Sequence, residues 1–201
     1  NLRPAEHGAD IVITSATKYL NGHSDLVAGA VAGAASLVEE VNRLLRCWGA
    51  AIDPHTAWLV DRGLRTLAVR MQRHNANGLA VAQWAEGHPG ITKVHYPGLA
   101  SHPDHELAAG LLGGFGGVVG LELKGGLRAA ERALRRLKLV AHAPSLAGVE
   151  SLVSEPRLTS HRNLDAAARA RAGIPDGFLR LSCGLEDAED IIADLEQAVA
   201  R

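Results

Sequence analysis

Short apolar segments alternate along this chain with longer amphipathic segments, and this alternation limits the folds that the chain can adopt. Apolar, β-branched runs bounded by polar residues are typical of buried strands, and they occur at residues 11–14, 26–32, 91–96, 118–123 and 178–183. Apolar residues at spacings of three and four predict helices over about 35–46, 55–86, 127–137 and 187–200. Because strands and helices alternate without a repeat of fixed period, we expect an α/β fold.

The amphipathic segment over residues 55–86 is longer than an average helix and contains two weak points, Gly63 and Gly78. It predicts either two helices end to end or one kinked helix that joins two domains. We therefore expect a division near residue 60, into a part of residues 1–60 and a part of residues 61–201.

The composition argues against several classes of partner. Of the 201 residues, 47% are hydrophobic and 21% are charged, and the net charge is -1, as is typical of a soluble globular protein. The sequence has no strongly basic segment, so we do not expect it to bind nucleic acid. No apolar run reaches the roughly 18 residues that a membrane span needs. Cys47 and Cys183 match no paired metal-ligand spacing, so we expect reduced thiols and a cytoplasmic protein.

Lys18 follows directly after the first predicted strand, in a polar segment that also contains Ser15 and Thr17. An amine in this place can act as a nucleophile that forms a Schiff base with an aldehyde cofactor, and closely spaced hydroxyl groups can bind its phosphate. The alternative is a surface lysine beside turn residues that make local hydrogen bonds. The short spacing alone does not decide between these two interpretations.

A longer pattern surrounds Lys18: Ala-Asp-Ile-Val, then Ser-Ala-Thr-Lys-Tyr-Leu-Asn-Gly-His-Ser-Asp, then Val-Ala-Gly, all within residues 9–29. It closely resembles the cofactor-lysine signature of the Cys/Met-metabolism pyridoxal-phosphate enzymes. That family includes cystathionine γ-synthase, cystathionine γ-lyase, cystathionine β-lyase, methionine γ-lyase and the O-acylhomoserine sulfhydrylases. Similar segments continue toward the other end of the chain, at residues 61–67, 96–103, 114–117, 143–151 and 179–187.

The resemblance implies a fold and a set of site residues. The fold would be the carboxyl-terminal part of a fold-type I pyridoxal-phosphate transferase, with the end of the large cofactor domain followed by the small α/β carboxyl-terminal domain. Lys18 would hold pyridoxal 5'-phosphate, and Ser15 and Thr17 would bind its phosphate. Arg180 would clamp the α-carboxylate of a small amino-acid substrate, with Ser145 nearby. The full-length protein would be a homo-oligomer, a dimer of dimers.

The resemblance also favours one reaction. Several γ-lyases and γ-synthases of the family carry a glutamate just before the serine that matches Ser145, whereas this chain has Pro144 there. The Ala-Pro-Ser form is more similar to plant-type cystathionine γ-synthases, which predicts transsulfuration by γ-replacement on an O-acylhomoserine. Cystathionine γ-lyase and O-acylhomoserine sulfhydrylase remain alternatives, and Ala147 stands where the family usually has glycine.

Some family features lie upstream of the first residue of this sequence. The aspartate that partners the pyridine nitrogen and the tyrosine that stacks on the ring precede the family's lysine by more residues than this chain has. We therefore expect a fragment that by itself binds the cofactor weakly or not at all and does not turn over. A hypothesis of a different class is a truncated, non-catalytic dimerisation or scaffold piece.

Two other kinds of site are disfavoured. His102 and His105, with His95 nearby, do not have a standard zinc spacing, and Pro103 interrupts a helical display, so we expect no metal site. A Ser-His-Asp hydrolase built on Ser24 and Asp25 lacks a G-x-S-x-G elbow.

Overall fold

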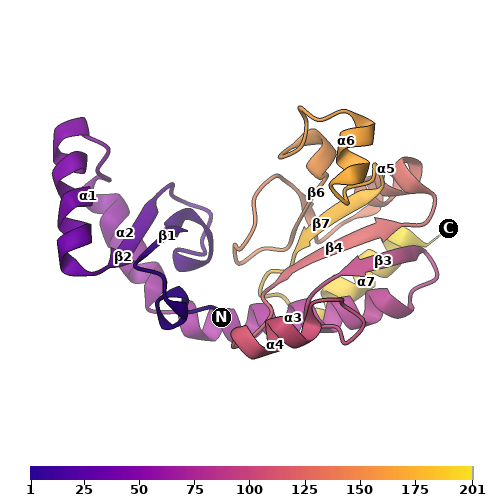
Figure 1. Ribbon diagram of the computed structural model, residues 1–201. Helices are drawn as coiled ribbons and strands as arrows, with labels where there is room; N and C mark the ends of the chain where they lie inside the picture. Colours follow the sequence, from indigo (N-terminus) through magenta and orange to yellow (C-terminus); the bar gives the residue numbers. More distant parts are fainter. Residues whose placement is uncertain (201) are drawn as a thin grey trace. The chain divides into compact units, whose positions relative to one another are not determined.

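A computed structural model describes residues 1–200 of the chain (Figure 1). By its internal contacts the chain divides into two compact units, Asn1–Val69 and Arg70–Arg201. The boundary between the units lies within helix α3 (Leu67–Gly87). The domain division expected near residue 60 stays a prediction. None of the helices in residues 1–200 combines the length and the apolar character that a membrane crossing needs.

The first unit is built on a two-stranded antiparallel sheet of β1 (Ile11–Ser15) and β2 (Gly29–Gly33), with Ser15 paired to Gly29 at the end where the chain turns. A short 3₁₀ helix η1 (Pro4–His7) precedes β1, and a π-helical turn η2 (Ala16–Leu20) follows it. Two α-helices complete the unit, α1 (Ala35–Trp48) and α2 (Pro54–Leu64). Asp53 caps α2, because its carboxylate accepts hydrogen bonds from the N–H groups of His55 and Thr56.

The first predicted strand exists, but the expectation that it is buried is wrong within the described part of the chain. The side chain of Ile13 in β1 is 78% exposed, and no residue of α1 is buried. A strand in a two-stranded sheet is covered only where another layer packs on it, and residues 1–69 provide little such cover.

The second unit contains a five-stranded sheet in the order β3-β4-β7-β6-β5. Its strands are β3 (Ile91–His95), β4 (Val118–Leu123), β5 (Ala141–His142), β6 (Leu152–Ser154) and β7 (Phe178–Ser182). All neighbouring strands are antiparallel except β5 and β6. The sequence analysis predicted β3, β4 and β7 but missed the short strands β5 and β6.

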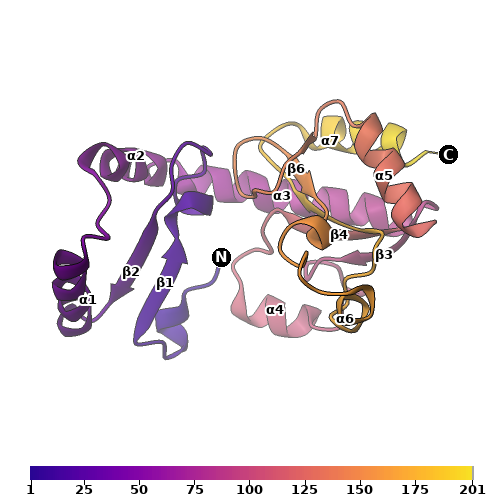
Figure 2. The ribbon, with the colours of Figure 1, turned by 90° about the horizontal axis from the view of Figure 1, so that it is seen from above.

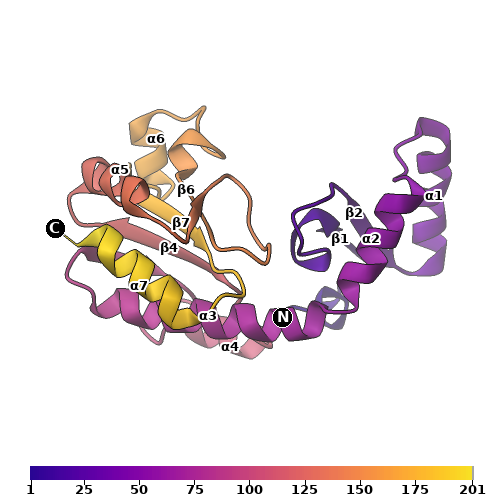
Figure 3. The same ribbon diagram turned by 180° about the vertical axis from the view of Figure 1, so that it is seen from behind.

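Three helices pack against one face of this sheet. They are α3, α5 (Gly126–Arg136) and α7 (Ala188–Val199), and α3 and α7 run along the same face in Figures 1 and 3. Figure 2 shows α5 beside α7. The core that they enclose includes Val81, Ala82, Ala85, Val119, Leu121, Leu123, Ala130, Ala133, Val153, Leu179, Leu181, Ile191, Leu195 and Ala198. Every fully buried leucine removes its side chain from water, which stabilises the unit by about 1.5–3 kcal/mol.

The long helical segment predicted over 55–86 is two helices, α2 and α3, which is one of the two arrangements expected. The predicted helices near 127–137 and 187–200 correspond to α5 and α7. Two short helices were not predicted, α4 (His105–Leu111) and α6 (Ala166–Arg171), and a short 3₁₀ turn η3 (Pro156–Leu158) precedes α6.

Asp194 on α7 fixes the turn that follows α5. Its carboxylate accepts hydrogen bonds of 2.9 Å each from the N–H groups of Lys138, Leu139 and Val140. Burial alone would raise the pKa of Asp194, but these N–H groups and the amide of Gln197 bind the ionised form and lower the pKa below its ordinary value. The ionised carboxylate therefore stabilises the folded chain.

We expect Asp194→Asn to reduce the free energy of unfolding at pH 7 by about 1–3 kcal/mol, because an amide cannot satisfy three N–H donors as a carboxylate does. Since the folded-state pKa is lowered, the advantage of Asp194 is fully present above the unfolded pKa of about 3.9 and disappears as the pH falls through the lower folded value. Urea titrations from pH 7 to pH 3 measure both effects. The exposed Asp190→Asn is the control, and an equal loss in both variants would contradict the prediction.

The two cysteines are free thiols in opposite environments. Cys47 is exposed, whereas Cys183 is 0% exposed and its burial, with the nearby Glu186 carboxylate, raises the pKa of its thiol to about 12. Because the thiolate is the reactive form, iodoacetamide at pH 8 should alkylate only Cys47 in the native chain and both cysteines in urea. Mass spectrometry after quenching checks this, and rapid native labelling of Cys183 would disprove it.

Candidate active site

Lys18 lies in the turn η2, which begins directly after β1 ends. Its backbone has φ −91° and ψ −129°, so it interrupts the helical geometry of the turn. The N–H of Gly22 donates to the carbonyl of Lys18 at 2.7 Å, and the N–H of Asn21 donates to the carbonyl of Ala16 at 3.0 Å. The lysine is half-buried and its backbone is held by bonds from the residues that follow it.

Thr17, predicted to bind phosphate, is engaged with Ala28. Its hydroxyl donates to the Ala28 carbonyl at 3.2 Å and accepts from the Ala28 N–H at 2.9 Å. A hydroxyl has a single proton, so Thr17 could donate to a phosphate only by giving up its bond to the carbonyl. Ser15 is exposed at the end of β1. The phosphate-binding role of both residues stays a prediction.

Arg180 lies in the middle of β7, opposite Gly120 of β4 and Ser154 of β6. Its Nη2 donates to the carbonyls of Pro144 and Ser145 at 3.2 and 3.3 Å. Its Nε is buried and has no hydrogen-bond partner among residues 1–200. Burial lowers the pKa of Arg180, but an arginine remains protonated in proteins. The guanidinium therefore keeps a buried N–H donor that the described residues leave unsatisfied.

The loop that contacts Arg180, residues 143–151, is anchored at two points. The N–H of Ala147 donates to the Ser182 hydroxyl at 2.8 Å, and Ser151 donates to the Glu186 carboxylate through both its N–H and its hydroxyl. Ala147 is fully buried and has φ 69°, a left-handed conformation that glycine adopts more readily. Glycine would adopt this conformation at a lower cost than Ala147 does.

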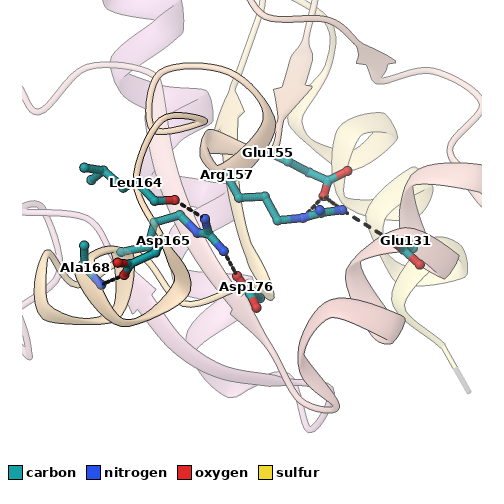
Figure 4. Close-up of polar contacts among 8 residues, drawn as sticks. Glu131, Glu155, Arg157, Leu164, Asp165, Ala168 and Asp176 are labelled. Atoms are coloured by element: carbon teal, nitrogen blue, oxygen red, sulfur yellow. Dashed lines mark hydrogen bonds and ion pairs between the residues drawn. The ribbon is translucent and has the colours of Figure 1, made fainter.

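The segment between β6 and β7 is held by ion pairs and carbonyl contacts (Figure 4). Arg157 pairs with the buried Glu155 at 2.6 Å and with Glu131 of α5 at 3.3 Å. Arg169 donates to the carbonyl of Leu164 and to Asp176, at 2.6 Å each. These contacts fix the connection that leads into β7 and thus into Arg180.

The structure sorts the predicted site residues into two clusters, one in each unit. Ser15, Thr17 and Lys18 are neighbours at the end of β1, and Ser145 and Arg180 meet through the Ser145 carbonyl. The sequence analysis missed Asn21, Asp25 and Ala28, whose contacts fix the lysine turn. Their positions inside the signature around Lys18 were the available signal, but spacing does not reveal which side chains bond to each other.

The histidines that could suggest a metal site have other contacts. His95 pairs with Glu122 at 2.6 Å, and His105 Nδ1 lies 2.8 Å from the carbonyl of Pro97. No group of three or more His, Cys, Asp or Glu side chains within residues 1–200 is arranged to hold a metal ion. Asp25, considered for a hydrolase site, accepts a hydrogen bond from Asn21.

Each cluster, taken by itself, offers groups of the kind that pyridoxal-phosphate chemistry uses. A half-buried amine on a hydrogen-bonded turn suits a covalent bond to an aldehyde, and the exposed Ser15 hydroxyl is available beside it. The buried Nε donor of Arg180 suits a carboxylate. Thr17 fits less well as a donor, because its proton is used by Ala28.

The family model described as "Cys/Met metabolism PLP-dependent enzyme" matches residues 1–200. A cystathionine beta-lyase of Coxiella burnetii is 47% identical over 98% of this chain and 51% of the relative, and an O-succinylhomoserine sulfhydrylase of Pseudomonas aeruginosa is 44% identical over 98% and 49%. The chain thus spans about half the length of these curated relatives.

A solved structure extends the similarity to three dimensions. The crystal structure of cystathionine gamma synthase from Xanthomonas oryzae pv. oryzae in complex with cystathionine matches with a TM-score of 0.94 and 44% identity, over 99% of this chain and 52% of that chain. The match confirms the α/β fold as part of a fold-type I enzyme. The chain belongs to the Cys/Met-metabolism family of pyridoxal-phosphate-dependent enzymes.

Proposed function

We propose that this chain supplies the lysine-bearing part of a pyridoxal-phosphate-dependent enzyme of sulfur amino-acid metabolism, with Lys18 as the cofactor lysine. The observation that supports this most is the position of Lys18 on a hydrogen-bonded turn at the end of β1, within a chain whose whole described length matches the family. Ser15 would donate to the cofactor phosphate, and Thr17 would join it if its bond to Ala28 were exchanged.

Each site residue would have a separate task. Pyridoxal phosphate, when bound, supplies an electron sink for charge that develops at the substrate Cα. Lys18 would hold the cofactor through Nζ and, once displaced by the substrate amine, would accept the Cα proton and return protons to the substrate. Arg180 would orient the substrate by binding its α-carboxylate with charge-assisted hydrogen bonds.

We propose γ-replacement on an O-acylhomoserine, the reaction of cystathionine γ-synthases, as the activity. The sequence Ala143-Pro144-Ser145 supports this choice, because it resembles the form found in plant-type cystathionine γ-synthases. Sulfhydrylation of an O-acylhomoserine is the second candidate, favoured by the 44% identity to the Pseudomonas sulfhydrylase. Cystathionine γ-lyase activity is a third.

Product analysis separates these reactions in an active preparation that contains the chain. O-succinylhomoserine with cysteine yields cystathionine in a γ-synthase, O-succinylhomoserine with sulfide yields homocysteine in a sulfhydrylase, and cystathionine alone yields cysteine in a γ-lyase. We expect the first reaction to have the highest kcat/KM.

A homo-oligomer and a cytoplasmic location are also proposed. Large apolar side chains of the first unit support further assembly, since Trp48 is 78% exposed and Val27 is 84% exposed. The free thiols of Cys47 and Cys183 are compatible with a reducing compartment. Gel filtration with light scattering measures the assembly directly.

The role of Lys18 can be tested by chemical trapping. The chain is incubated with millimolar pyridoxal phosphate, reduced with borohydride and digested, and the adduct on each of Lys18, Lys93, Lys124 and Lys138 is measured by mass spectrometry. We expect Lys18 to carry most of the adduct and Lys18→Arg to lose it without a gain elsewhere. An even distribution of the adduct over the four lysines would favour the scaffold hypothesis.

Arg180 should determine the affinity for the amino-acid substrate. In an active preparation, Arg180→Lys should raise KM by roughly 10- to 100-fold, because a point charge does not replace the fork of a guanidinium on a carboxylate. Arg162→Lys, an exposed arginine in the segment before β7, should leave KM unchanged. If Arg180→Lys kept the wild-type KM, the proposal that Arg180 binds the substrate α-carboxylate would be wrong.

A further inference from the structure

We propose that Asn21, Asp25 and Gly63 form a latch that fixes the backbone conformation of Lys18, so that Asp25 and Gly63 are positioning residues for the Lys18 amine. The functional meaning of this latch rests on the proposed role of Lys18. The latch itself is defined by contacts within the first unit.

Asn21 is the centre of the latch. It is 1% exposed, and its N–H donates to the Ala16 carbonyl at 3.0 Å. Its carbonyl accepts from Nδ1 of His23 at 2.6 Å, and its side-chain amide donates to the Asp25 carboxylate at 2.7 Å. A buried amide with these bonds has few alternative positions, because each lost bond costs about 0.5–1.5 kcal/mol or more.

The position of Asn21 is transmitted to Lys18 through the backbone. The N–H of Asn21 donates to the carbonyl of Ala16 at the start of the turn, and the N–H of Gly22 donates to the carbonyl of Lys18 at 2.7 Å. Lys18 therefore lies inside the turn that Asn21 closes on Ala16, and its own carbonyl is held by Gly22, the neighbour of Asn21. A shift of Asn21 must change the dihedral angles of Lys18 or break one of these bonds.

Asp25 is brought to Asn21 by an unusual backbone conformation. Ser24, the residue before Asp25, has φ 57°, which is in the left-handed region that favours glycine. Such a conformation costs about 1–3 kcal/mol in a residue other than glycine and is retained where the surrounding contacts require it. The 2.7 Å bond from Asn21 to Asp25 is one such contact.

Gly63 of α2 closes the latch from the other side. It is buried, and a Cβ at this position would lie 2.6 Å from the carbonyl oxygen of Asn21 and 2.9 Å from its Cα. The helix backbone therefore packs directly on Asn21, and any larger residue must push Asn21 away. This contact is a physical reason for glycine at position 63.

A pocket lies beside Asn21, so the hydrogen bond to Asp25 is needed to keep the Asn21 side chain in one position. A pocket of about 180 Å³ adjoins Asn21, His23, Asp25, Arg62, Gly63 and Thr66. If the amide of Asn21 lost its acceptor on Asp25, its side chain could rotate toward this pocket. The turn that contains Lys18 would then populate several conformations.

The test measures the environment of the Lys18 amine without any cofactor. Reductive methylation of the intact native chain gives the rate at Lys18 relative to Lys93, Lys124 and Lys138, which are exposed lysines of the second unit. In the wild type we expect Lys18 to react more slowly than these three. In Asp25→Ala and Gly63→Ala the relative rate at Lys18 should rise to theirs.

Three control variants separate the proposed effect from a general loss of stability of the chain. Asp25→Asn keeps an acceptor oxygen for Asn21 and should restore the wild-type rate. Asp61→Ala removes an exposed aspartate from α2, and Gly110→Ala adds a methyl group to a helical glycine with nothing within 4 Å; both should behave as wild type. Circular dichroism and urea unfolding check the fold, and if Gly63→Ala does not fold, the comparison of Asp25→Ala with Asp25→Asn decides.

The latch is overturned if Asp25→Ala and Gly63→Ala leave the Lys18 rate unchanged, or if Asp61→Ala and Gly110→Ala change it equally. Pyridoxal phosphate trapping on the same variants adds a separate result. Loss of the Lys18 adduct in Asp25→Ala, with recovery in Asp25→Asn, would connect the latch to the cofactor. Absence of the Lys18 adduct in an active preparation that contains the chain would defeat the proposed function, while the methylation rates still decide the latch.

Discussion

The packing of one face of the five-stranded sheet against α3, α5 and α7 is the constraint on which the second unit depends. Side chains alternate along a strand, so β7 directs Leu179 and Leu181 into this core and Arg180 to the other face. The burial of the two leucines thereby sets the direction of the guanidinium. The hydrophobic effect, which has no chemical role in the reaction, orients the residue proposed to bind the substrate.

The first unit is organised by a different kind of interaction. Its helix α1 has no buried residue, and its sheet has two strands, so an apolar core contributes little to its shape. Hydrogen bonds define the lysine turn instead, from Thr17 to Ala28 and from Asn21 to Asp25. The loss of one bond can change such a turn locally, whereas a core residue is held by many neighbours at once.

The two clusters also differ in what they offer to a ligand. In the first, the Thr17 hydroxyl is occupied by Ala28, and the amine of Lys18 is the chemically distinctive group. In the second, two backbone carbonyls hold one nitrogen of Arg180 while its buried Nε keeps a donor that the described residues leave unused. A carboxylate would form stronger bonds with the guanidinium than neutral carbonyls do, because both partners are charged.

The sequence by itself determined the alternation of strands and helices, the family and the residue types of the candidate site, and it left open whether residues 55–86 form two helices or one kinked helix. These features are local: they follow from hydrophobic periodicity, from glycine positions and from contiguous motifs around Lys18 and Arg180. Only the tertiary structure showed that β1 is exposed, that Thr17 is committed to Ala28, and that Gly63 packs on Asn21. Hydrogen bonds and close contacts join residues that are distant in the chain, and they depend on distances of a few tenths of an ångström that spacing along a sequence does not encode.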